Sequence, residues 1–201
     1  SAIAGKIVDP RDESHHDKYP YSIEQSGTLE IPSGENRRIE SVWNYKDVDN
    51  LNTDQMFAGN LTYKVLSSDA ESIMPYLFEG FDAAFSKNVQ AGDIIIAGDN
   101  FGCGSSREHP AVGLAHAGVK AVIVKSINRI FFRSAVNQGL PIIVLPEVVD
   151  AYEMGNKVTI DFQAGSILIG DKKFNFNPLP DKLIGIFEAK GLVNYIKNLE
   201  V

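Results

Sequence analysis

A glycine-rich turn followed by two serines and an arginine is the part of this chain best equipped for chemistry. It reads GDNFGCGSSREH over residues 98–109, between an apolar run at 93–97 and a run of small residues at 110–117. The first run predicts a strand and the second a helix. Backbone N–H groups converge at the start of a helix, and the helix dipole favours negative charge there, so the expected ligand is an anion. The side chains that would hold this anion, or exchange a proton with it, are Ser105, Ser106 and Arg107.

Each of these side chains also has a structural interpretation. Serine is a favoured helix N-cap, so one of the two serines could do no more than cap the helix. Arg107 could form a surface ion pair with its neighbour Glu108. Gly102 and Gly104 favour a site, because glycine lets the backbone approach a ligand closely.

The same turn resembles the serine-serine-arginine signature of the swivel domain of the aconitase superfamily. The similarity covers about residues 41–197, and its further matching segments are 52–56, 78–82, 121–126 and 128–133. The resemblance implies an α/β fold of the aconitase-type swivelling β/β/α kind, with a partly parallel central sheet flanked by helices. It divides the chain into an N-terminal arm, residues 1–40, and a swivel domain, residues 41–201.

The resemblance also implies an activity. Such a domain is one half of an iron-sulfur hydro-lyase, which isomerises a small hydroxy di- or tricarboxylate by dehydration and rehydration. Isopropylmalate-type small subunits are favoured, with the C-terminal domain of a single-chain aconitase or homoaconitase as the alternative, because residues 4–12 look like the stretch before that domain. A 4Fe–4S cluster is expected on a large partner subunit or domain, and this chain alone is expected to bind no cofactor or metal and to be inactive.

The matching residues take over the roles of the family's motifs. Ser105 resembles the base that removes or returns a proton beside a substrate carboxylate. A hydroxyl is a poor base unless its anion is stabilised, which N–H groups at a helix start and the guanidinium of Arg107 would do. Ser106 resembles a hydrogen-bond donor to the substrate carboxylate, and Arg107 would bind a carboxylate with two parallel bonds.

Two segments upstream complete the predicted site. Asp54 is predicted to be catalytic by orienting the acid-base groups, with an Asx-turn as its structural alternative, and Thr53 is predicted to bind substrate. Residues 57–65 correspond to the family's flexible loop, where Thr62 and Lys64 would meet the variable end of the substrate. Thr62 is neither the small or apolar residue of isopropylmalate-type loops nor the arginine of homoaconitase-type loops, so the loop leaves the substrate open.

Hydrophobic periodicity predicts the elements that must position these residues. Alternating apolar strands and helices after residue 92 indicate parallel strands joined by right-handed crossovers. The expected strands are 41–45, 93–97, 119–125 and 141–145, followed by a hairpin of 158–162 and 166–169. The expected helices are 69–85, which Pro75 must bend or divide, 110–117, 127–138 and 192–199, and residues 61–68 are expected to form a loop.

Composition limits the class of protein. With 201 residues, 44% hydrophobic and 22% charged, the chain can bury one substantial core, and its net charge of −7 argues against nucleic acid or an anionic membrane as a partner. Its single cysteine, Cys103, excludes an internal disulfide and a thiolate cluster, and predicts a cytoplasmic location. We find no apolar run near the ~18 residues that a bilayer span needs.

Two other classes fit parts of the sequence. A strand, a glycine-rich turn and a helix also describe a dinucleotide-binding module, but Arg107 replaces its third glycine and Lys125 stands where the following acid belongs. A pure interaction domain without chemistry is the other class. Arg129 and Arg133 lie four apart on one helix face, either as solvated charges or as a contact with a partner protein.

Overall fold

The structure is a computed structural model that describes residues 37–199. The chain divides into two units, Ser1–Glu35 and Asn36–Val201, and the described residues all belong to the second unit. The predictions placed on residues 1–36, which include most of the N-terminal arm, lie outside the described residues.

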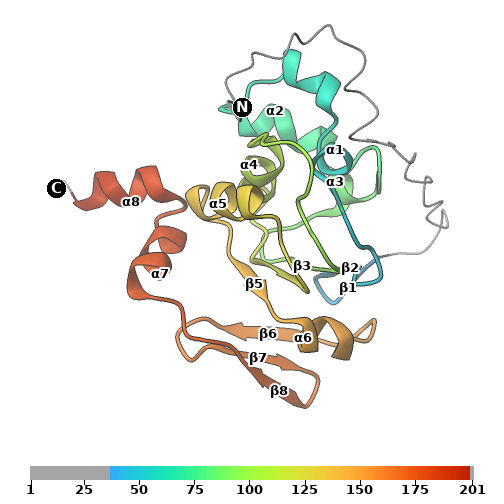
Figure 1. Ribbon diagram of the computed structural model, residues 1–201, viewed down its shortest axis with the longest axis vertical. Coiled ribbons are helices and arrows are strands. Elements are labelled where there is room, and N and C mark those ends of the chain that lie inside the picture. The colour runs from blue at the N-terminus through green and yellow to red at the C-terminus, as the bar shows by residue number, and fades with distance from the viewer. Residues whose placement is uncertain (1–36, 200–201) are drawn as a thin grey trace, which may run out of the picture. The chain divides into compact units, whose positions relative to one another are not determined.

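A five-stranded sheet forms the centre of the second unit (Figure 1). Its strands follow one another in sequence order: β1 (Arg38–Ile39), β2 (Val42–Tyr45), β3 (Ile94–Ala97), β4 (Ala121–Val124) and β5 (Ile142–Val144). Strands β2 to β5 are parallel, and β1 pairs with β2 in the antiparallel direction. The predicted βαβαβ run and the partly parallel sheet are confirmed.

Helices cover one face of this sheet. They are α2 (Ala70–Ile73), α4 (His109–His116) and α5 (Arg129–Asn137). Leu114 of α4 and Phe131 of α5 share a core cluster with the strand residues Trp43, Ile95 and Val122. All four residues of β3 and of β4 are buried, as expected for parallel strands that are covered on both faces.

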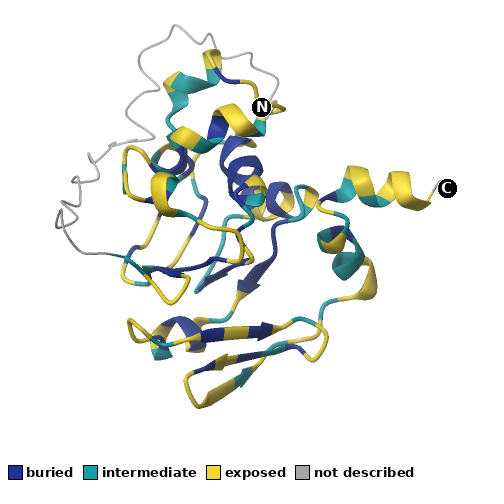
Figure 2. Cartoon of the chain, turned by 180° about the vertical axis from the view of Figure 1, so that it is seen from behind, coloured by how far each residue is buried: buried dark blue, intermediate teal, exposed yellow. Residues whose placement is uncertain are grey.

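A second sheet covers the opposite face. It contains β6 (Val158–Asp161), β7 (Ser166–Ile169) and β8 (Lys172–Asn175), all antiparallel. Together with α6 (Pro146–Ala151) it packs against Ile94, Ile96 and Ile123, so the fold has three layers in the predicted β/β/α order. Figure 2 shows that β8, the edge strand of this second sheet, and α8 (Leu192–Leu199) are mostly exposed.

Several elements differ from those expected. The predicted helix over 69–85 is three pieces, α2, the 3-10 helix η3 (Met74–Tyr76) and α3 (Phe85–Asn88). Pro75 lies in η3, and Phe78 has a left-handed φ of 59°, so the chain cannot continue as one helix. The elements without a predicted counterpart include β1, α1 (Thr53–Met56), α6, β8 and α7 (Asp181–Glu188). The loop expected over 61–68 begins inside a second 3-10 helix, η2 (Gly59–Tyr63).

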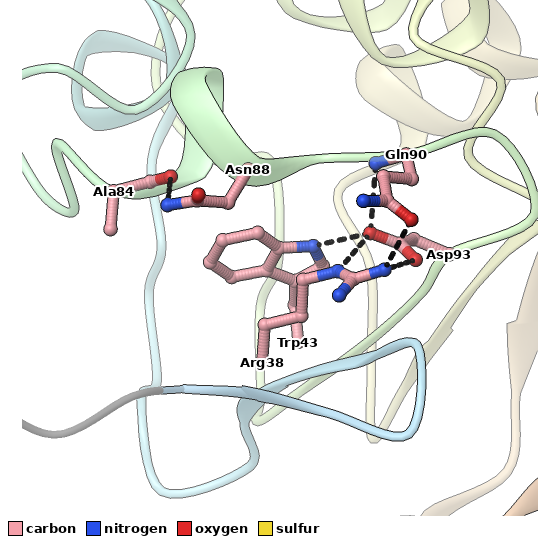
Figure 3. Close-up of polar contacts among 6 residues, drawn as sticks. All are labelled: Arg38, Trp43, Ala84, Asn88, Gln90 and Asp93. Carbon is pink, nitrogen blue, oxygen red and sulfur yellow. Dashed lines mark hydrogen bonds and ion pairs between the residues drawn. The ribbon is translucent and has the colours of Figure 1, made fainter.

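An ionic cluster fastens the edge of the sheet where the parallel strands begin (Figure 3). The buried carboxylate of Asp93 accepts hydrogen bonds from Arg38 Nε at 2.7 Å and Nη2 at 2.8 Å. It also accepts from Trp43 Nε1 at 2.9 Å and from the backbone N–H of Gln90 at 3.0 Å. Burial by itself would raise the pKa of Asp93, but these donors outweigh it and hold the pKa below its ordinary value. The cluster ties β1 and β2 to the start of β3.

Candidate active site

The serine turn lies between the end of β3 and the start of α4, as predicted. It is fixed on both sides by isolated parallel bridges, Asn52 to Cys103 and Phe101 to Ile127. The N–H of Gly102 also donates to the carbonyl of Leu51 at 2.8 Å. The segments that follow β2, β3 and β4 therefore meet at one edge of the sheet.

Two glycines let the turn pack closely against its own chain. Gly102 has a φ of 72°, and a Cβ there would lie 2.3 Å from Cγ of Phe131. Gly104 has a φ of 101°, and its Cβ would lie 3.0 Å from Oγ1 of Thr53. Both glycines therefore allow a close approach within the protein, Gly102 to the Phe131 side chain and Gly104 to the Thr53 hydroxyl.

Thr53 meets Ser105 from a separate segment. It is the first residue of α1 (Thr53–Met56), which a capping box starts: the Asn52 side chain accepts from the N–H of Gln55, and the Gln55 side chain accepts from the N–H of Asn52, both at 2.9 Å. Thr53 is 1% exposed. Its hydroxyl accepts from the N–H of Ser105 at 3.0 Å and lies 3.1 Å from Oγ of Ser105. The two hydroxyls therefore form one hydrogen-bonded pair.

Asp54 and Arg107 form an ion pair beside these hydroxyls. Asp54 Oδ1 also accepts from the N–H of Gly59 at 3.1 Å. The Arg107 side chain is 21% exposed, and its buried Nε has no hydrogen-bond partner within residues 37–199. The structure thus pairs Arg107 with Asp54 and not with Glu108, and Asp54 lies in the first turn of a helix whose cap is Asn52.

The serines do not cap α4. Its N-cap is Glu108, and among the described residues no side chain caps that helix. Ser105 is half-buried and Ser106 is exposed. Within residues 37–199, the backbone N–H groups of Ser106, Arg107 and Glu108 donate to no backbone carbonyl. These free donors at a helix start suit an anion.

The loop after α1 reaches the ion pair through Gly59. The hydroxyl of Thr62 donates to the carbonyl of Gly59 at 2.7 Å, within η2. Lys64 is exposed, and the side chain of Tyr63 is 93% exposed. Sequence reasoning missed Gly59, although a glycine that follows the Thr53–Asp54 pair by a few residues is a visible signal of a tight approach.

Two further residues of the turn, His109 and Cys103, contact only other parts of the protein among the described residues. His109 is buried, and its Nε2 is hydrogen-bonded to the carbonyl of Val65 at 2.9 Å. Its ring stacks on the Phe57 ring with the centroids 4.8 Å apart. The thiol of Cys103 donates to the carbonyl of Asn50 at 3.5 Å, and burial raises its pKa. Within residues 37–199, no group of three or more His, Cys, Asp or Glu side chains could hold a metal. One thiol with a raised pKa does not fit an iron-sulfur cluster, whose ligands are several thiolates.

The described cavity of about 1050 Å³ lies elsewhere. Residues of α4, β6 and α7 line it together with the segment that follows α5, among them Val112, Gln138, Ile160 and Phe187. The serine turn lies outside that lining, with Ser106 exposed and Ser105 and Arg107 half-buried. The paired hydroxyls, the fixed guanidinium and the free N–H groups are together the kinds of donor that can bind an anion such as a carboxylate.

A three-layer β/β/α domain with a glycine- and serine-rich turn after a central parallel strand is the class that the fold and the site define. Residues 26–147 match the family model of the aconitase C-terminal domain. The chain belongs to the aconitase C-terminal domain family. The resemblance inferred from the sequence is confirmed, and the dinucleotide-binding alternative is set aside.

Relatives of this chain are small subunits of dehydratases. It is 41% identical over 151 residues to the 3-isopropylmalate dehydratase small subunit 1 of Methanopyrus kandleri, covering 74% of this chain and 87% of the relative. It is also 41% identical over 162 residues to the 2,3-dimethylmalate dehydratase small subunit of Eubacterium barkeri, covering 80% and 96%. A crystal structure of 3-isopropylmalate dehydratase from Methanocaldococcus jannaschii matches with a TM-score of 0.67 and 36% identity, over 76% of this chain and 89% of that one. Across residues 37–199, none of the helices has the length and apolar character that a membrane span requires.

Proposed function

We propose that this chain is the small subunit of a 3-isopropylmalate dehydratase, a hydro-lyase that isomerises its substrate by dehydration and rehydration. The observation that carries the proposal is the open Ser105–Arg107 turn, on a chain 41% identical to such a subunit over 87% of that subunit's length. The turn supplies hydroxyl and guanidinium groups that are exposed at Ser106 and partly exposed at Ser105 and Arg107, and a second subunit would bring the rest of the site.

The residues of the turn and of α1 have different roles in this proposal. Ser105 exchanges the proton next to a substrate carboxylate, and Thr53, 3.1 Å away, donates its hydrogen to Ser105 Oγ and so stabilises the alkoxide. Thr53 is buried, so its role is to position Ser105 and not to touch substrate directly as the sequence suggested. Ser106 and Arg107 bind the carboxylate, and Asp54 holds the guanidinium in place.

The iron centre belongs to the partner in this proposal. The described residues of this chain do not fit a cluster, and the relatives are small subunits, a name that implies a large one. A 4Fe–4S cluster on the large subunit, the absence of nucleic acid from its partners and a cytoplasmic location remain predictions.

The loop over residues 57–65 supports an alkyl malate as the substrate. The Thr62 hydroxyl donates to Gly59, so it is not free for an additional substrate carboxylate. Such a loop suits a malate with an alkyl substituent better than the tricarboxylates of aconitase or homoaconitase. The coverage of 96% of a 2,3-dimethylmalate dehydratase small subunit makes that reaction, on another alkyl malate, the second candidate. Lys64 is exposed and would lie nearest the variable end of either substrate.

Reconstitution tests the proposal. The chain is mixed with the cluster-bearing large subunit of 3-isopropylmalate dehydratase and, separately, of 2,3-dimethylmalate dehydratase. Each mixture is assayed with isopropylmalate, 2,3-dimethylmalate, citrate and homocitrate. We expect isopropylmalate to give the highest kcat/KM, and each subunit alone to give no turnover. A preference for 2,3-dimethylmalate would establish the second candidate, and a preference for citrate or homocitrate would contradict both.

A further inference from the structure

One face of α5 exposes side chains that helices normally bury or pair. Ile130 is 53% exposed and Phe132 is 37% exposed, and Arg129 and Arg133 beside them are exposed as well. The opposite side of the same helix is buried at Phe131, Ser134 and Ala135. Arginine and large apolar side chains that stand together on a surface are typical of the centre of a protein interface.

The two arginines do not serve the helix itself. Arg129 is the first residue of α5, and a cation at a helix N-terminus opposes the helix dipole. Within the described part of the chain, neither guanidinium forms an ion pair or a side-chain hydrogen bond. The chain has a net charge of −7, so acidic groups are plentiful, yet neither arginine is paired with one. We therefore expect acidic groups of another molecule to form ion pairs with these two arginines.

The exposed face adjoins the serine turn. The N–H of Asn128, the N-cap of α5, donates to the carbonyl of Phe101 at 2.9 Å. Ile127 forms a β-bridge with Phe101, and the Phe131 ring lies against Gly102. The rings of Phe131 and Phe101 pack edge to face, with their centroids 5.4 Å apart. The first turn of α5 is therefore built directly on the segment that carries the candidate site, and a subunit that closes over this segment passes beside α5.

We propose that the exposed face of α5, formed by Arg129, Ile130, Phe132 and Arg133, is a docking surface for the large cluster-bearing subunit. The inference rests on the proposed function, because that function requires such a partner. The matching surface of the partner carries carboxylates for the two guanidiniums and an apolar patch for Ile130 and Phe132. The docking surface sets the affinity of the two subunits and leaves the chemistry to the serine turn.

A double charge reversal tests this surface. Arg129→Glu/Arg133→Glu is compared with wild type and with Lys172→Glu/Lys173→Glu, which reverses two exposed lysines on β8 in the other sheet. The Kd for the 3-isopropylmalate dehydratase large subunit is measured by calorimetry, and kcat is measured at saturating large subunit. Thermal melts of the isolated variants check that both fold.

We expect the α5 variant to raise Kd by about tenfold or more, with kcat at saturation within about twofold of wild type, and the β8 variant to change neither. The wild-type Kd should also rise with salt more steeply than that of the α5 variant. An unchanged Kd would overturn the inference, and so would a loss of kcat at saturation with Kd unchanged.

Two further results also decide against the inference. If the α5 variant changes the mass of the isolated chain by light scattering but not Kd, the face joins copies of this chain. If wild type neither binds nor activates the large subunit, the proposed function itself fails.

Discussion

The hydroxyl of Thr53 lies 3.1 Å from that of Ser105, although 52 residues separate them in the chain. The same Thr53 oxygen accepts the backbone N–H of Ser105, so both the position and the electrostatics of Ser105 depend on a buried side chain of another segment. With that N–H as a donor to it, the Thr53 hydroxyl is free to donate its own hydrogen to Ser105 Oγ.

Replacing Thr53 by valine tests this dependence. Thr53→Val keeps the shape but removes the hydroxyl, so Ser105 loses a donor and its N–H loses its acceptor. We expect kcat of the reconstituted enzyme to fall about 10- to 100-fold, as a loss of 1–3 kcal/mol implies, with the affinity for the large subunit unchanged. Steady-state kinetics measure this. Thr53→Ser, which restores the hydroxyl, should recover most of kcat, and equal losses in both variants would refute the role.

Arg107 should tolerate no substitution by lysine. Its guanidinium is held by Asp54 and offers further N–H donors, including the buried Nε. Lysine keeps the charge but cannot form two parallel bonds to a carboxylate. We expect Arg107→Lys to lower kcat/KM about 10- to 100-fold, mainly by raising KM. Initial rates over a range of substrate concentration separate the two terms, and a wild-type KM would contradict carboxylate binding by Arg107.

The Asp93 cluster should make stability depend on pH. The pKa of Asp93 lies below its ordinary value, so its ionised form stabilises the fold fully above the unfolded-state pKa of about 3.9, and this stability is lost as pH falls further. Asp93→Asn should reduce the free energy of unfolding at pH 7 by about 2 kcal/mol, less than for a fully buried pair because the Arg38 side chain is 21% exposed.

Urea unfolding of wild type and Asp93→Asn at pH 7, 5 and 3.5 measures this effect. The difference in free energy should be the same at pH 7 and 5 and smaller at pH 3.5. A difference that stays constant at the lowest pH would show that the charge of Asp93 contributes nothing.

The sequence predicts the central sheet well, because each strand is marked by an apolar run within its own residues. The apolar runs at β3 and β4 are buried on both faces, and the amphipathic pattern of α5 has one buried side, so periodicity alone identifies them. The helix predicted over 69–85 changes to a 3-10 helix at Pro75, where a bend or division was expected. It stops at Phe78, which adopts a left-handed φ and is fully buried in the core, and periodicity cannot anticipate that break.

The candidate site could be predicted in part. Ser105, Ser106 and Arg107 are marked by their own motif, but the partner of each is not. The pairing of Thr53 with Ser105 and of Asp54 with Arg107 depends on how the segments after β2 and β3 meet at the sheet edge. From sequence alone, the neighbouring Glu108 is an obvious ion-pair partner for Arg107. In the folded chain, Arg107 instead pairs with Asp54, which is distant in sequence.

The account depends most on Ser105 as the group that exchanges the substrate proton. The direct test is proton-deuterium exchange, in which the reconstituted enzyme is incubated with isopropylmalate in deuterated water and the label is followed by NMR. We predict that wild type incorporates deuterium next to the carboxylate. Ser105→Ala should bind the large subunit with wild-type affinity yet exchange at least about 100-fold more slowly. Exchange at the wild-type rate in Ser105→Ala would contradict the central claim.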